Sequence, residues 1–489
     1  MLFNSHAFAV FFPVVLLLYY VLRHRGQNIL LLLASYVFYG WWNYKFLALL
    51  WLSTGVDFFI AARLDAINAP RARRRLMALS VGLNLLYLGV FKYFNFFSDS
   101  FASALEAIGL HADLPTMKVI LPVGISFYTL QSISYIVDVY RRERAHEKDF
   151  LAYAVYISYF PHLLAGPIQR SWQLIPQILR PRRVNAKGVR TGVLLMLVGY
   201  FKKVAVADAV APIVDAIFSS HPHVPAVWPR ATLLGGAFLF LLQVYCDFSG
   251  YSDIARGVSR LLGIELSINF AQPLLAPNMT EFWRSWNISV AQWLRDYIYI
   301  PLGGNRVGRW RTHRNIMATM LLGGFWHGAS WKFVFWGGLN GLALLVHKYF
   351  LDVRTLYCGE TSLNRAKGRV AQLGGILLTL VVESLIMVFF RAPSLSDGLK
   401  YLLGIAISSV SSVGESLFSR PWQTGVIGFY ILAVFILDAL TRARDDRELP
   451  FASSWPYPLR GLAYGALVSM CLWVGLSGDK SAPFIYFQF

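Results

Sequence analysis

One histidine in apolar sequence is the strongest candidate for chemistry. His327 follows an apolar stretch that begins near Asn315. A helix starting at Asn315 would place it about 18 Å along its axis, within a hydrocarbon core roughly 30 Å thick. A histidine at that depth is costly unless it faces a cavity, so a functional role is the default hypothesis. The alternative is a structural histidine hydrogen-bonded across helices, since Gly324 and Gly328 have the small-xxx-small spacing that lets a neighbouring helix approach.

A buried amide is the second candidate. Asn278 followed by Glu281 is a capping-box-like start signal, and Pro301-Leu-Gly-Gly is a stop signal. These signals predict a single aromatic, amphipathic helix between them. Four positions share one of its faces: Trp283, Asn287, Val290 and Leu294. Asn287 is therefore expected on the apolar face, where the alternative to a functional amide is one that hydrogen-bonds backbone at a helix contact.

Together these two side chains suit acyl transfer. A neutral imidazole can take a proton from a hydroxyl as that hydroxyl attacks an acyl carbonyl. An amide can donate a hydrogen bond to the developing oxyanion or orient the acceptor. There is no GxSxG, no Walker loop, and HEKDF at 146–150 lacks the second histidine of HExxH. A covalent serine, nucleotide hydrolysis and zinc proteolysis are not indicated, and no metal site is expected from three isolated cysteines.

The composition indicates a membrane protein that positions these residues. The chain has 489 residues, of which 56% are hydrophobic and 15% charged, with a mean hydropathy of +0.50. This predicts an all-α, polytopic helical protein with roughly ten to twelve spans. No internal repeat or soluble segment is apparent, so residues 1–489 are expected to form one membrane-embedded domain. Residues 151–169, broken by Pro161, Gly166 and Pro167, are expected to be re-entrant or surface-lying.

The net charge of +19 is concentrated in short clusters between apolar segments. This is the positive-inside pattern, and it places residues 141–150 and the arginine-rich loop from Asn305 to Arg314 in the cytoplasm. Attraction to membrane lipid and to an anionic cytosolic donor follows from the same charge. Nucleic acid is not an expected partner, because no nucleic-acid-binding signature accompanies the charge.

Seven further side chains are candidates for contact with substrate: Trp283, Trp286, Tyr245, Asp247, Trp326, Asp296 and His162. Several of these side chains also have a structural interpretation. The tryptophans also suit an interfacial belt. Asp247 and Asp253 can instead pair with Arg or Lys inside the bundle, and His162, next to Pro161, can be structural.

Several motifs resemble those of the membrane-bound O-acyltransferase (MBOAT) superfamily, in its bacterial alginate O-acetyltransferase branch. They are QVYCDFSGYSDIARG (243–257), EFWRSWNISVAQWLRDYIYIPLGGNR (281–306), GGFWHGASWKFVFWGGLNG (323–341), AGPIQR (165–170) and the ending FIYFQF (484–489). The resemblance covers nearly the whole chain. It implies a multi-helix fold with a tunnel through the membrane and a catalytic core at about 120–350. The family's catalytic histidine maps onto His327 and its second polar position onto Asn287.

Many close relatives in the family have histidine at that second position, whereas this chain has asparagine there, as eukaryotic members commonly do. The resemblance therefore leaves His327 as the only base candidate. The resemblance implies an O-acetyltransferase of the bacterial inner membrane, with acetyl-CoA as the expected cytosolic donor and no permanently bound cofactor. The acceptor would be an exported polysaccharide such as alginate, reached through a periplasmic acetyltransferase or SGNH-type partner. Two alternatives stay open: a peptidoglycan, teichoic acid or lipid acceptor, and a non-enzymatic glycan transporter, although no inverted repeat supports transport.

Overall fold

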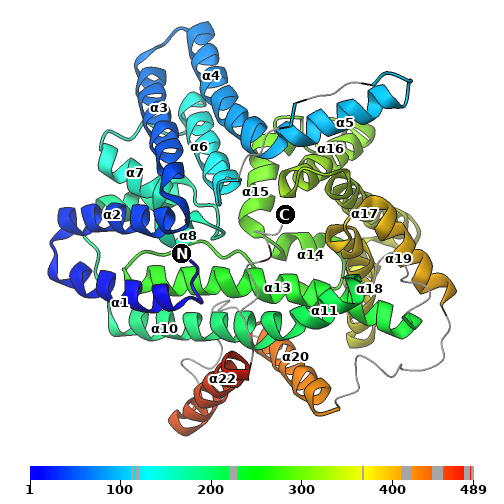
Figure 1. Cartoon of the computed structure of the whole chain (residues 1–489). Coiled ribbons are helices and arrows are strands. Elements are labelled where there is room, and N and C mark those ends of the chain that lie inside the picture. The colour runs from blue at the N-terminus through cyan, green and yellow to red at the C-terminus, as the bar shows by residue number, and fades with distance from the viewer. Residues whose placement is uncertain are drawn as a thin grey trace. The chain divides into compact units, whose positions relative to one another are not determined.

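The computed structural model describes residues 1–111, 115–116, 121–219, 228–365, 368–408, 421–442, 455–477 and 485. Across them the secondary structure is helical, without a strand (Figure 1). The predicted all-α class is thereby confirmed. Of the motif at 484–489, only residue 485 lies within the described part. The chain divides into two compact units, residues 1–196 with 254–267, and residues 197–253 with 268–489.

The first unit is built from helices in the N-terminal part of the chain. They are α1 (His6–Val21), α2 (His24–Asn43), η1 (Tyr44–Phe46), α3 (Leu47–Ala66), α4 (Pro70–Leu88), η2 (Gly89–Tyr93), α5 (Phe94–Glu106), α6 (Ile125–Tyr140), α7 (Phe150–Ser158), α8 (Phe160–Leu163), α9 (Ser171–Leu179) and most of α10 (Ala186–Tyr200).

Buried polar groups tie these helices together. Asp57 on α3 accepts hydrogen bonds from the Ser80 hydroxyl and the Asn84 amide on α4, so its carboxylate is paired within the bundle. The Arg73 guanidinium donates to the carbonyls of Val139 and Tyr140 at the end of α6. Each bond satisfies a group that would otherwise be costly to bury.

The predicted re-entrant stretch forms two short helices, α7 and α8, with a break at Tyr159. Residues 152–171 are buried without exception. Irregular backbone at membrane depth is tolerated only where protein or a cavity surrounds it. The burial of this broken stretch meets that condition.

The second unit contains the remaining elements. They are η3 (Phe201–Asp208), α11 (Ala209–Ser219), most of α13 (Arg230–Leu261), η4 (Pro273–Leu275), α14 (Met279–Ser285), α15 (Ile288–Leu294), η5 (Arg295–Tyr299), α16 (Arg309–His327), α17 (Trp331–Arg365), α18 (Arg369–Arg391), α19 (Leu395–Ile407), α20 (Pro421–Arg442) and α22 (Tyr457–Ser477).

Helices α16 and α17 of this unit pack closely against each other. A β-carbon at Gly324 would collide with the Phe333 carbonyl, and one at Gly337 would collide with the Met320 carbonyl. The backbones approach this closely because both positions lack a side chain, as in small-residue helix contacts of membrane proteins. The close approach predicted at Gly324 is therefore confirmed.

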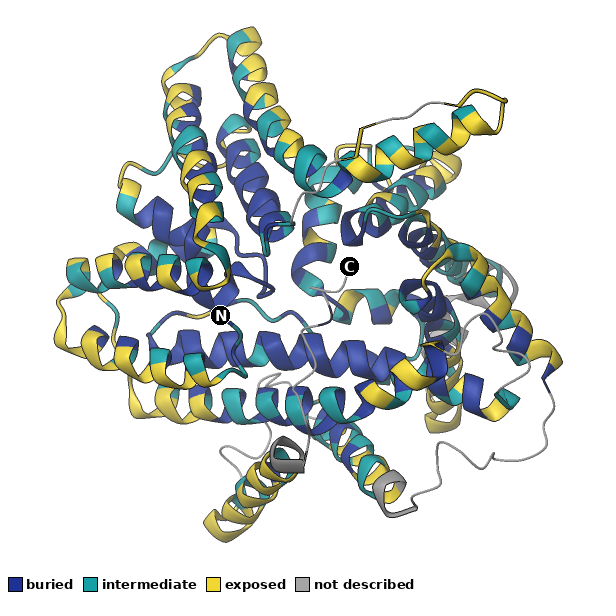
Figure 2. Cartoon of the chain, viewed as in Figure 1, coloured by how far each residue is buried: buried dark blue, intermediate teal, exposed yellow. Residues whose placement is uncertain are grey.

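Five stretches of the described residues are long and apolar enough to cross a membrane: His24–Ala66, Pro70–Glu106, Arg230–Leu261, Arg369–Arg391 and Gly425–Arg442. Figure 2 shows α13 buried over most of its length and α22 largely exposed. Other predicted spans fall on shorter apolar helices such as α1, so the total of ten to twelve stays a prediction. The exposed apolar faces are those expected of helices that meet lipid.

Candidate active site

The aromatic helix that was predicted from the Asn278 and Glu281 start signal begins as expected. Asn278 is the N-cap of α14, where its side-chain oxygen accepts a hydrogen bond of 3.0 Å from the Glu281 backbone N–H. The Asn278 amide also donates to the Glu281 carboxylate at 3.2 Å. These two bonds hold the first turn of the helix.

The prediction of one continuous helix up to Pro301 is wrong, because the chain breaks at Trp286 and Asn287. Trp286 is extended, and Asn287 has left-handed backbone angles of φ 43° and ψ 52°. Helix α15 restarts at Ile288, and its first turn is capped by another segment of the chain. The Ile288 N–H donates to the Asn269 carbonyl at 2.9 Å. The Ser289 N–H and hydroxyl donate to the Asn269 side-chain oxygen at 3.1 and 2.9 Å.

Because Asn269 caps α15, the side chain of Asn287 does not cap this helix. Asn287 is only 3% exposed, and within the described part of the chain neither its amide oxygen nor its amide nitrogen has a hydrogen-bond partner. Leaving a buried polar group unpaired costs on the order of 1–3 kcal/mol. Such an exception in a folded protein needs an explanation, and a polar group of a substrate is one. Asparagine is also among the few residue types that tolerate left-handed angles.

His327 is the last residue of α16, which begins at Arg309 and not at the predicted Asn315. The helix starts earlier because Asn315 is used elsewhere: its amide donates to the carbonyls of Leu302 and Gly304, and so holds the preceding turn. After His327 the backbone is extended at Gly328. The imidazole therefore lies at a helix end, buried to 8% exposure.

Aromatic rings surround the imidazole of His327. The Trp326, Trp336 and Phe390 rings contact it edge to face, with centroids 5.0, 5.1 and 5.5 Å away. Lys332 donates to the carbonyls of Phe390 and Ala392, which fixes the end of α18 beside the histidine. The ring is thus held by packing from three helices, α16, α17 and α18.

The rings of Trp326, Trp336 and Phe390 form an aromatic frame around His327. Trp336 connects this aromatic frame to α14, the helix that precedes Asn287. Its ring lies 5.8 Å from that of Trp283 on α14, and the Trp283 indole N–H donates to the Asn340 side chain on α17 at 3.2 Å. On the other side of the break, a β-carbon at Gly323 of α16 would lie 3.0 Å from Leu294 of α15. Helices α14 and α15 therefore contact the helical hairpin formed by α16 and α17, which carries His327 (Figure 1).

Three of the predicted substrate contacts are engaged inside the protein. Trp286 stacks on Phe282 with centroids 5.2 Å apart. The Tyr245 hydroxyl donates to the Asp438 carboxylate at 2.8 Å. Asp247 pairs with Lys203 at 2.7 Å and accepts from the Ile485 backbone N–H at 2.7 Å.

The alternative for the two aspartates, pairing with basic residues in the bundle, is confirmed. Asp253 also pairs with a lysine, Lys202, at 2.8 Å.

The remaining candidates lie in different surroundings. Trp326 is buried beside His327, and Asp296 accepts a hydrogen bond from its neighbour Arg295 at 2.8 Å. His162 belongs to the first unit. It is 3% exposed against the Tyr159 ring, and neither ring nitrogen has a hydrogen-bond partner among the described residues. Its assignment as a substrate contact stays a prediction.

One buried acid was missed by sequence reasoning. Glu383 on α18 is fully buried, and neither carboxyl oxygen has a hydrogen-bond partner in the described part of the protein. Phe390, later on the same helix, contacts His327. The available signal was a single acid within the apolar run LLTLVVESLIMVFF, since an ionisable residue inside a span is a functional candidate.

The site thus combines a buried imidazole with an unpaired buried amide on contacting elements. An imidazole can accept and return a proton, and the amide N–H can stabilise a developing oxyanion. No group of three or more metal-ligating side chains occurs in the described ranges.

Comparison with known proteins identifies the family of the chain. The model of the membrane-bound O-acyltransferase family matches residues 139–382. The chain is 41% identical, over all of both chains, to a probable alginate O-acetylase of Azotobacter vinelandii and to one of Pseudomonas putida. It is 35% identical to a peptidoglycan O-acetyltransferase of Helicobacter pylori, over 84% of this chain and 81% of that protein. The chain belongs to the membrane-bound O-acyltransferase family and is a multi-pass membrane O-acyltransferase.

Proposed function

We propose that this protein transfers an acetyl group from acetyl-CoA, bound on the cytoplasmic side of the bacterial inner membrane, for O-acetylation of an exported polysaccharide such as alginate. The observation that carries the proposal is the buried amide of Asn287, which has no hydrogen-bond partner among the described residues. It lies between α14 and α15, which contact the helices on either side of His327. The names of the alginate O-acetylases at 41% identity support the acceptor class.

In this proposal His327 is the general base. Its imidazole takes the proton of the acceptor hydroxyl as the hydroxyl oxygen attacks the thioester carbonyl carbon. The carbonyl oxygen becomes an oxyanion and accepts a hydrogen bond from the Asn287 amide. When the tetrahedral intermediate collapses, the carbon–sulfur bond breaks, and the imidazolium returns its proton to the leaving thiolate. No covalent acyl-enzyme is required.

The acceptor hydroxyl belongs either to the polysaccharide or to a periplasmic acetyltransferase or SGNH-type partner that completes delivery. A peptidoglycan acceptor is the second candidate, favoured by the Helicobacter pylori relative at 35% identity. Teichoic acid is a third, since a teichoic acid D-alanyltransferase of Streptococcus thermophilus is 28% identical over 47% of this chain.

The test is acetyl transfer by the purified protein in lipid nanodiscs, with radiolabelled acetyl-CoA and either polymannuronate or peptidoglycan. His327→Ala should lower transfer by about 10²–10⁴-fold, the usual contribution of a general base. His313→Ala, near the start of the same helix, is the matched control and should leave the rate unchanged.

Equal rates for wild type and His327→Ala, with both proteins folded, would exclude the proposed base and favour the transporter alternative. Transfer to peptidoglycan but not to polymannuronate would replace the proposed acceptor and keep the chemistry.

A further inference from the structure

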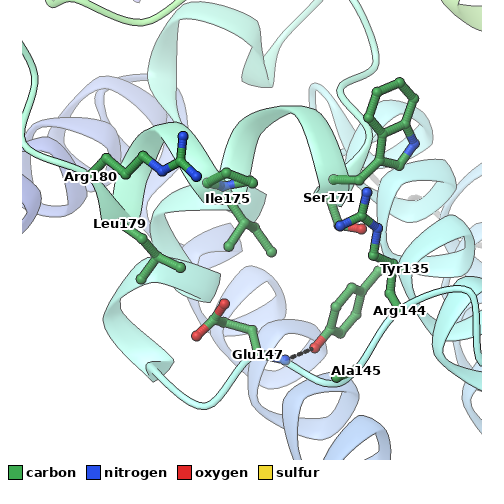
Figure 3. A pocket seen from close by; sticks show the side chains of 10 residues that line it. Tyr135, Arg144, Ala145, Glu147, Ser171, Ile175, Leu179 and Arg180 are labelled. Carbon is green, nitrogen blue, oxygen red and sulfur yellow. Dashed lines mark hydrogen bonds between the residues drawn. The ribbon is translucent and has the colours of Figure 1, made fainter.

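The first unit contains a pocket that the sequence did not indicate. It has a volume of about 250 Å³ and lies between one face of α9 and the segment 144–147. Figure 3 shows the side chains that line it. The segment 144–147 belongs to the basic loop at 141–150, which the charge pattern places in the cytoplasm.

The wall opposite α9 is held in place by local hydrogen bonds. The Glu147 backbone N–H donates to the Tyr135 hydroxyl at 2.8 Å, and the Glu147 carboxylate accepts from the Asp149 N–H at 2.9 Å. His146 contacts the Asp65 carboxylate at 2.8 Å. A pocket with a fixed wall needs little ordering when it binds a ligand, which favours affinity.

Two arginines give the pocket a positive character. Arg144 lies beside Ser171, and the Arg180 guanidinium extends over the pocket from the end of α9 toward Ile175 (Figure 3). Among the described residues that line the pocket, two arginines stand against one acid, Glu147, whose carboxylate accepts from the Asp149 N–H. A planar guanidinium offers paired N–H donors that match the oxygens of a phosphate.

A buried hydroxyl in the lining points to a ligand independently. Ser171 is 4% exposed, and its hydroxyl has no hydrogen-bond partner among the described residues. It is the first residue of α9, a helix of nine residues. Backbone N–H groups at a helix start favour an anion, so the hydroxyl and the helix start suit the same ligand.

Trp172 adds an aromatic surface next to these polar groups. Its side chain lines the pocket and is 48% exposed. An exposed indole beside a phosphate-binding group is suited to stacking on a planar base. The volume of the pocket accommodates one end of a nucleotide and is smaller than a site for a complete large cofactor.

We propose that this pocket binds a phosphorylated nucleotide, with phosphate on Arg144, Arg180 and Ser171 and the base on Trp172. Phosphate is also carried by anionic lipid headgroups, so the experiment separates the two sources.

The probe is adenosine 3′,5′-bisphosphate, titrated into full-length protein in nanodiscs of zwitterionic lipid. Arg144→Ala/Arg180→Ala should weaken binding by about 10- to 100-fold, because both charged contacts are lost. Arg74→Ala/Arg75→Ala is the matched control: these arginines are exposed, lie on α4 outside the pocket, and remove the same charge. The control should change binding by less than about threefold. Trp172→Leu should weaken it by about tenfold through lost stacking.

Three results would overturn the proposal: no nucleotide binding by wild type, equal weakening by the two double variants, or arginine-dependent binding of phosphatidylglycerol vesicles without nucleotide binding. Failure of the proposed function looks different. Arginine-dependent nucleotide binding by a protein that transfers no acetyl group would support the pocket and contradict the function.

Discussion

Two buried polar regions of the second unit differ in how their charges and amides are paired. In one, Lys202 pairs with Asp253 and Lys203 with Asp247, while Tyr245 donates to a carboxylate on α20. In the other, the Asn287 amide and the Glu383 carboxyl are equally buried but have no hydrogen-bond partner among the described residues.

This difference distinguishes buried polar residues that stabilise the fold from buried polar residues that serve the reaction. A buried charge that is paired stabilises one arrangement of helices, and removing one partner leaves the other uncompensated. A buried amide or carboxyl without a partner lowers stability, and it is retained where a substrate can complete its hydrogen bonds. The sequence analysis proposed Asn287 as a catalytic residue and Tyr245 and Asp247 as substrate contacts, but all three are polar residues in apolar surroundings, and residue type alone does not show which of them is paired.

The largest expected effect on stability is in the paired region. Lys203→Met would leave Asp247 and Asp208 without their lysine, so it should lower the free energy of unfolding by about 3–5 kcal/mol. Denaturant-induced unfolding in mixed micelles measures this. Lys187→Met, the same change at an exposed position of α10, should stay within about 0.5 kcal/mol of wild type. Equal stability of the two variants would show that the lysine pair is not structural.

A smaller effect, on activity, is expected at the unpaired carboxyl. Glu383→Gln keeps the shape of the side chain and should lower kcat/KM by about tenfold, equivalent to about 1.4 kcal/mol of transition-state stabilisation. Unfolding should change little, because the amide has the same size as the carboxyl and leaves no charge in the buried position. Glu106→Gln, at an exposed position of α5, is the control. Lower stability with unchanged kcat/KM would place Glu383 in the structural class instead.

The smallest effect is expected in the aromatic frame between the two candidate catalytic residues. Trp283→Phe removes the indole N–H that donates to Asn340 while keeping a ring against Trp336. One lost neutral hydrogen bond corresponds to about 0.5–1.5 kcal/mol, or roughly a two- to tenfold lower rate. Acetyl transfer at saturating donor measures it. A rate equal to that of wild type would mean that the frame does not position Asn287.

Much of the site was predictable because its signals are local. The helical class follows from composition, the start of α14 from Asn278 and Glu281, and the close contact at Gly324 from residue spacing. The break at Asn287 was not predictable, because its cap comes from Asn269, outside the helical stretch. For the same reason the helix carrying His327 starts early: Asn315 bonds to a preceding turn. The pocket beside α9 likewise depends on segments that only folding brings together.

The most direct test compares one unpaired with one paired side chain of the second unit. Asn287→Gly removes the amide and keeps a residue that accepts left-handed angles. It should lower kcat by about 10²–10³-fold with unfolding unchanged, as for a lost oxyanion donor. Tyr245→Phe removes the hydroxyl bound to Asp438, and should cost about 1–3 kcal/mol of stability while folded protein keeps its kcat. If Asn287→Gly instead lowered stability and left kcat unchanged, the amide would be structural and the proposed site would be wrong.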